Sequence, residues 1–90
     1  MNKTIKEMSK LDGKVYVHLT DDERGNAFLN QAEAEGFTFG DGAKPTSRPY
    51  AELMAVHPDN TISYVGIAGR IAFGTGAEHI GEQKINRIEF

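Results

Sequence analysis

The side chains with the most suggestive chemistry in this chain are cations and aromatic rings that lie near glycines in the sequence. Arginine and lysine side chains bind phosphate, and aromatic rings stack on nucleobases. The candidate ligand-binding residues are Phe39, Lys44, Arg48, Tyr64 and Arg70. If the loop of residues 38–48 folds over the face that holds residues 64–70, these side chains form a pocket for a small nucleotide. The alternative interpretation is that the rings belong to the core and the cations face solvent.

Glycines and a further ring support the same hypothesis. Tyr50 would add a third flat face, and glycines would expose backbone amides to a phosphate; they are Gly40, Gly42, Gly66 and Gly69. The glycine-rich segment 66–76 is not a phosphate-binding loop of known type, because it lacks the G-x-x-x-x-G-K-[ST] pattern. It is expected to be a twisted or bulged strand, in which glycines mark a close approach by another backbone or a ligand.

Catalytic and metal-binding patterns are missing from the sequence. The chain has no cysteine, which excludes disulfides, thiolate metal sites and cysteine nucleophiles. The three histidines, His18, His57 and His79, do not have the spacing of a metal-binding pair. No serine lies in a G-x-S-x-G motif or has a recognisable order of partners. We therefore expect a non-enzymatic binding protein with no metal and no cofactor.

Size and charge restrict the class of protein further. Ninety residues suit one domain, 1–90. Such a chain buries only about 60–65% of the surface that its unfolded form exposes, so its margin of stability is thin. Self-association would increase that margin, and a homo-oligomer is therefore as much expected as a monomer. A net charge of −3 is too acidic for a non-specific nucleic-acid binder and too mild for a DNA mimic. The sequence shows no signal peptide and no apolar run of transmembrane length, which predicts a cytoplasmic protein.

The first quarter of the chain predicts a short helix and a strand, and the main helix follows them. Apolar residues spaced by three over Thr4–Leu11 predict a short helix, with a frayed arm as the alternative. Alternation over Lys14–Leu19 predicts a strand. The main helix is expected at Asp21–Glu35, started by a capping box of Thr20 with Glu23. Gly36 in the left-handed conformation would end it, with Phe37 folding back on the last turn.

The second half of the chain predicts strands. A short strand over residues 37–39 is followed by a tight turn at Gly40-Asp41-Gly42 and by a polar loop to Pro49. A hairpin of Tyr50–Val56 with Thr61–Phe73 comes next, and a last strand covers Ile85–Phe90. We therefore predict an α+β fold: a four- to five-stranded antiparallel sheet in β-α-β-β-β-β order, with one main helix packed on one face and a short N-terminal helix.

Two segments carry a resemblance to a known group of proteins. At residues 35–46 (EGFTFGDGAKPT) and 62–66 (ISYVG), the chain resembles a family of small proteins encoded by Firmicutes phages and prophages. The resemblance extends from about Lys14 to Gly76. It implies an antagonist of bacterial antiphage defence that acts in the host cytoplasm.

The resemblance leaves the mode of antagonism open. The protein would sequester a cyclic-nucleotide signal, or it would bind and occlude a defence nuclease as anti-CRISPR proteins do. The candidate pocket favours sequestration, because a protein-surface inhibitor more often shows an acidic patch or an exposed apolar anchor. A structural or regulatory subunit is the third alternative. The partner is thus a small nucleotide or a host defence protein, with no membrane and no sequence-specific nucleic-acid contact.

Overall fold

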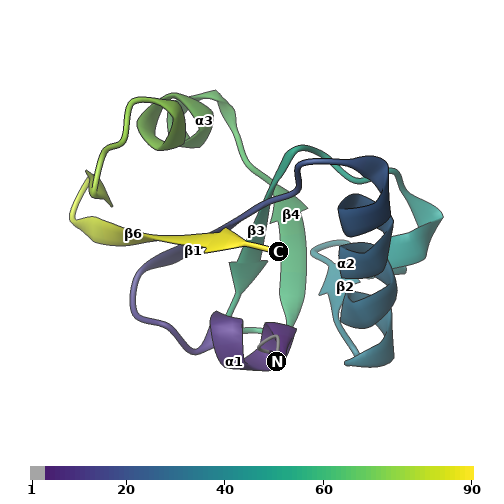
Figure 1. The fold of residues 1–90 in the computed structure, drawn as a ribbon. Helices are drawn as coiled ribbons and strands as arrows, with labels where there is room; N and C mark the ends of the chain where they lie inside the picture. The colour runs from purple at the N-terminus through teal and green to yellow at the C-terminus, as the bar shows by residue number, and fades with distance from the viewer. Residues whose placement is uncertain (1–3) are drawn as a thin grey trace.

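The structure is a computed structural model that describes residues 4–90. It contains three α-helices, a short 3-10 helix and six strands (Figure 1). In chain order the elements are α1 (Ile5–Ser9), β1 (Lys14–His18), α2 (Asp22–Ala34), β2 (Thr38–Phe39), η1 (Pro45–Ser47), β3 (Leu53–His57), β4 (Thr61–Tyr64), α3 (Ile67–Gly74), β5 (His79–Ile80) and β6 (Gln83–Glu89).

The strands form one mixed sheet in the order β2-β4-β3-β1-β6-β5. The pairs β1–β3, β3–β4 and β5–β6 are antiparallel, whereas β1–β6 and β2–β4 are parallel. The α+β class is therefore confirmed, but the prediction of a purely antiparallel sheet of four to five strands is wrong. Parallel neighbours need a crossover between them. For β1 and β6 the last part of this connection is α3, which leads the chain from β4 across the sheet to β5 and then to β6, beside β1.

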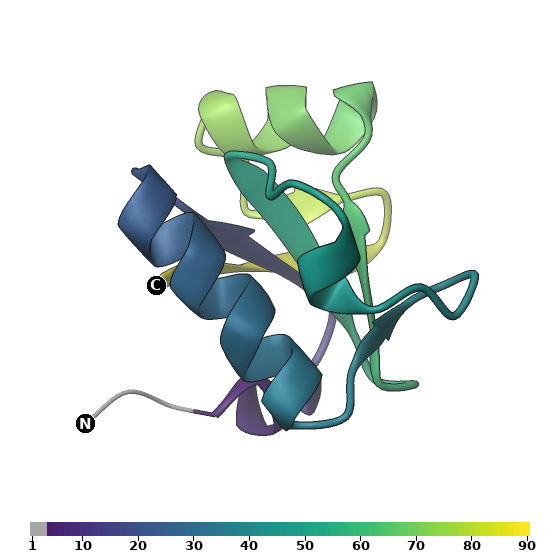
Figure 2. The same ribbon diagram turned by 90° about the vertical axis from the view of Figure 1, so that its right-hand side faces the viewer.

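Helices cover both faces of the sheet. Buried side chains from α1 and α2 pack on one face in the larger of two apolar clusters, in which Phe28 and Ala32 are fully buried. On the other face Ala72 and Phe73 of α3 pack over Tyr16 and Leu53. Figure 2 shows α3 lying across the molecule well away from α1 and α2. The predicted main helix on one face is therefore confirmed, but the second helix that covers the other face was not predicted.

The helix α3 replaces the second half of a predicted strand. The sequence analysis extended a strand from Thr61 to Phe73, but β4 ends at Tyr64 and a helix follows. The apolar side chains Ile67 and Ile71 are four residues apart, which is a helical spacing rather than a strand spacing. The glycines placed in that strand have other roles: Gly66 is the residue that starts the helix, and Gly69 lies buried inside it.

The ends of α2 show which local predictions hold. The predicted ending is confirmed: Gly36 has φ +86, its amide donates to Glu33 O, and the Phe37 amide donates to Ala32 O at 2.9 Å. This is the Schellman arrangement that glycine permits. The predicted start is wrong by one residue, because Asp21 caps the helix by accepting a hydrogen bond from the Arg24 amide at 2.8 Å. A capping box is present instead at α1, between Thr4 and Glu7.

Candidate functional site

Three of the five predicted ligand-binding residues meet at one end of the sheet. The Arg48 guanidinium lies 4.8 Å from the centre of the Phe39 ring, and the rings of Phe39 and Tyr64 are 5.6 Å apart, centre to centre. Tyr64 stands opposite Met54 in the β3–β4 register, on the face that α2 covers. We call Phe39, Arg48 and Tyr64 the loop cluster.

The groups of the loop cluster bind one another. Arg48 pairs with Asp41, and its hydrogen bond lowers the pKa of that carboxyl. The Tyr64 hydroxyl donates to Pro49 O at 2.6 Å, and Phe39 is only 3% exposed. The cation is thus neutralised within the chain and one ring is buried. These interactions hold the loop of residues 40–49 against the sheet rather than leaving its chemistry free.

Lys44 lies in the same loop but outside the cluster. It precedes η1, and its carbonyl accepts a hydrogen bond from the Ser47 hydroxyl at 2.6 Å. Its charge acts on Glu33 of α2: hydrogen bonds from Thr46 lower the pKa of Glu33 most, and Lys44 adds to the effect. Lys44 therefore belongs to the contact between η1 and α2.

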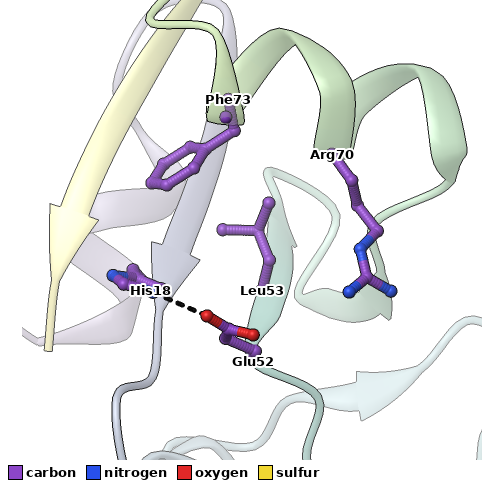
Figure 3. A pocket seen from close by; sticks show the side chains of 6 residues that line it. His18, Glu52, Leu53, Arg70 and Phe73 are labelled. Atoms are coloured by element: carbon purple, nitrogen blue, oxygen red, sulfur yellow. Dashed lines mark hydrogen bonds and ion pairs between the residues drawn. The ribbon is translucent and has the colours of Figure 1, made fainter.

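Arg70 lies on the opposite face of the sheet, in α3, where it borders a small pocket (Figure 3). The predicted five residues therefore do not form one site. The pocket measures about 170 Å³ and is lined by His18, Glu52, Leu53, Arg70, Phe73 and Gly74. Figure 3 shows His18 and Arg70 on opposite sides of Leu53, with Glu52 below Leu53 and between them. We call this the α3 pocket.

The volume of the α3 pocket decides what it can hold. A cavity of about 150 Å³ is enough for a benzene molecule, whereas pockets for drug-sized ligands have about 300–1,000 Å³. At about 170 Å³ the α3 pocket fits one side chain or one ring. It is too small to enclose a whole nucleotide.

Electrostatics on the β-sheet side of the α3 pocket centre on His18. Its Nε2 lies 3.3 Å from Glu52 Oε1, and its Nδ1 lies 3.1 Å from Glu89 Oε2. The hydrogen bond with Glu52, aided by the contact with Glu89, raises the pKa of His18 although burial opposes the shift. Since both ring nitrogens face carboxylates, the imidazolium form suits this position, and it partly neutralises Glu52 beside the pocket.

The helical wall of the α3 pocket is held by Arg87 of β6. Its Nη1 donates to Phe73 O at 2.7 Å and its Nη2 donates to Ala77 O at 2.6 Å. The guanidinium also lies 4.4 Å from the centre of the Phe73 ring. A cation at the C-terminal end of a helix satisfies free carbonyls and complements the helix dipole. Arg87 thus fixes the position of Phe73 and the end of α3.

The outer surface of α3 is apolar. Ile67 is 79% exposed and Ile71 is 61% exposed, whereas Gly69 of the same helix is buried. Residues four apart lie on one face of a helix, so the two isoleucines form a short ridge that points away from the sheet. We call Ile67 and Ile71 the α3 ridge. This ridge was not predicted, because both residues were expected to lie in a strand.

A hydrogen-bonded pair of side chains, Ser63 and His57, was also not predicted from the sequence. The Ser63 hydroxyl lies 2.7 Å from Nε2 of His57, across the β3–β4 hairpin. A nucleophilic serine needs a third group to orient its histidine. In the part of the chain that the structure describes, no hydrogen bond reaches the other ring nitrogen of His57. The pair therefore serves as a cross-strand hydrogen bond.

Other regions offer less chemistry. A shallow hollow of about 730 Å³ lies along β5 and β6, beside His79, Lys84 and Arg87, and contains none of the predicted ligand-binding residues. Over residues 4–90, no cluster of three or more histidine, aspartate or glutamate side chains is arranged to hold a metal ion. None of the helices in that range has both the length and the apolar character needed to span a bilayer.

The fold and site define a small α+β protein whose mixed sheet is covered by helices on both faces. Comparisons with family models, with curated proteins and with solved structures gave no match.

Proposed function

We propose that this is a non-enzymatic binding protein whose α3 ridge docks on the surface of a partner protein. The observation that carries the proposal is the exposure of two large apolar side chains, 79% for Ile67 and 61% for Ile71, on one face of a short helix. Helices presenting apolar anchors at i and i+4 are a recurring mode of protein recognition. An exposed apolar anchor is the feature that the sequence did not reveal.

The charge beside the ridge supports a protein partner with a complementary surface. Arg70 precedes Ile71 on α3 and is exposed. Apolar anchors surrounded by polar groups are typical of the centre and rim of a protein interface. The surface of the partner that binds the α3 ridge would be an apolar groove with a carboxylate at its edge.

The partner that we propose is a host defence protein. The resemblance of residues 35–46 and 62–66 to small phage proteins supports this partner, because it implies an antagonist of antiphage defence that acts in the bacterial cytoplasm. Within that class, the exposed α3 ridge favours occlusion of a defence protein, such as a nuclease, over sequestration of a signal molecule. Docking of this kind needs no metal, cofactor or catalytic group.

Site-specific photocrosslinking in host cells tests the docking surface. A benzoylphenylalanine placed at Ile67 or Ile71 should form a covalent adduct with the same partner protein. The matched control replaces Asn30, which is exposed on α2 on the other side of the sheet. Adducts of equal yield at Asn30, or no adduct at either ridge position, would contradict the proposal.

A second candidate is sequestration of a cyclic nucleotide by the loop cluster. Arg48 and Tyr64 both lie beside the buried Phe39 ring, and Tyr64 is exposed, which supports this function because a cation binds phosphate and an exposed ring stacks on a base. Binding would have to displace Asp41 from Arg48. Calorimetry with a panel of cyclic nucleotides tests it: heat that an Arg48→Gln variant abolishes would support sequestration, and no heat with any member would exclude it.

A further inference from the structure

We infer that the α3 pocket receives a single apolar or aromatic side chain of the docked partner, while Arg70 pairs with a carboxylate next to it. The partner would thus present an acidic, apolar segment to this side of the protein. This inference rests on the proposed docking function and adds the chemistry of the partner.

The shape of the pocket supports one inserted side chain. Leu53 and Phe73 give it apolar walls, and its volume of about 170 Å³ suits a group about the size of benzene. Phe73 is held in place by Arg87, so the wall exists before binding. Binding energy at protein interfaces concentrates on anchors that fill such preformed pockets.

The charge of Arg70 supports the presence of a carboxylate in the partner, next to the inserted side chain. The other three arginines are engaged within the chain: Arg24 with Asp21, Arg48 with Asp41, and Arg87 with the carbonyls at the end of α3. Across residues 4–90, Arg70 makes no ion pair and no side-chain hydrogen bond. If a partner covered it without an opposite charge, the buried guanidinium would weaken binding strongly.

The position of Glu52 gives the docked segment a direction. Glu52 borders the pocket on the side toward His18, with which it forms a hydrogen bond (Figure 3). A carboxylate of the partner would be repelled on the Glu52 side and attracted on the Arg70 side. The acidic residue of the segment therefore lies toward α3, and its apolar neighbour lies between Leu53 and Phe73.

Selection of random displayed peptides against the purified protein tests this chemistry. The full chain should enrich peptides that place a large apolar or aromatic residue beside an aspartate or glutamate. Changing that acidic residue of an enriched peptide to its amide should weaken binding roughly tenfold or more, as expected for a charge-assisted hydrogen bond. An Arg70→Glu variant should instead enrich lysine or arginine at the same position and keep the apolar residue.

The outcomes separate this inference from the docking proposal. An apolar consensus with no acidic preference, unchanged by Arg70→Glu, would overturn the inference and leave the docking proposal standing. Peptides that bind an Ile67→Ser/Ile71→Ser variant as well as the native chain would overturn the docking proposal itself. If the native chain enriches no peptide above the level obtained with the ridge variant, both the inference and the docking proposal are wrong. Circular dichroism of each variant confirms that it is folded.

Discussion

The backbone of Gly69 in α3 lies directly against the phenol of Tyr16 in β1. A Cβ at Gly69 would be 2.7 Å from Tyr16 Oη and 2.6 Å from a methyl group of Val65. The helix therefore sits so close to the sheet that a Cβ at this position would force the side chains of Tyr16 and Val65 to shift. Because α3 turns this face inward, Ile67 and Ile71 point outward, so the contact of Gly69 with Tyr16 creates the α3 ridge.

Gly69→Ala should therefore destabilise the protein, although alanine is usually the better helix residue. We expect a loss of about 1–3 kcal/mol in the free energy of unfolding, the range typical of an overpacked contact. Urea denaturation measures it. Gly74→Ala is the matched control, since no atom lies near its Cβ position, and it should be neutral or stabilising by up to about 1 kcal/mol. Equal stability of the two variants would show that α3 does not sit this closely on the sheet.

The contacts of His18 predict that stability falls as the pH rises. The hydrogen bond with Glu52, with the contribution of Glu89, raises the pKa of His18 above its usual 6.5 in the folded state. The folded state therefore holds the proton more tightly, and this stabilisation is complete below pH 6.5 and is lost as the pH rises through the folded-state pKa. Denaturation measured from pH 5.5 to pH 9 should show this loss.

A His18→Gln variant is the control for this titration. It keeps a hydrogen-bonding side chain but has no proton to lose, so its stability should change less over the same pH range. A wild-type curve parallel to that of the variant would mean that the contacts of His18 with Glu52 and Glu89 contribute nothing to stability.

Glu35 should anchor α1 to the end of α2. Its carboxylate accepts hydrogen bonds from the backbone amides of Ile5 and Lys6, both at 2.9 Å. Burial alone would raise the pKa of Glu35, but hydrogen bonds from Gln31 and from these two amides lower it overall. A lowered folded-state pKa gives stability that is present above the usual value of 4.5 and is lost as the pH falls through the folded-state pKa.

Glu35→Gln should remove part of that acid-sensitive stability and loosen α1. Hydrogen exchange is the measurement: the amides of Ile5–Ser9 should exchange faster in the variant, while those of α2 before its last turn keep their protection. Protection of α1 equal to that of the native chain would contradict the role of Glu35.

The local elements of the fold were more predictable than their pairing. Helix ends follow from short-range chemistry, so Gly36 and Phe37 identified the end of α2 correctly. The segment of residues 67–74 was mistaken because its apolar residues fit a strand over a few positions, and only the spacing of Ile67 with Ile71 and the glycine at position 76 indicated a helix. Gly76 has φ +78 and ends α3 as Gly36 ends α2. The parallel pairing of β1 with β6 depends on the crossover through α3. Because this helix was not predicted, the parallel pairing was not predicted either.

The candidate site was predicted in part. Phe39, Arg48 and Tyr64 meet because the loop before β3 folds onto the sheet edge, whereas the hypothesis from the sequence had this loop fold over one face that holds all of residues 64–70. Arg70 could not be placed, because its position depends on the helix that was missed. The pairing of Arg48 with Asp41 also could not be foreseen, since the geometry of an exposed loop is not encoded in residue type alone.

The affinity of the crosslinked partner for three purified forms of the protein shows whether α3 is the docking surface. The forms are the native chain, Ile67→Ser/Ile71→Ser and the control Asn30→Ala. Exposed positions of this kind usually change the free energy of unfolding by no more than about 0.5 kcal/mol, so all three should remain folded. We predict that the ridge variant binds at least about tenfold more weakly and that the control binds like the native chain. Equal affinity of all three forms would contradict the assignment of α3 as the docking surface.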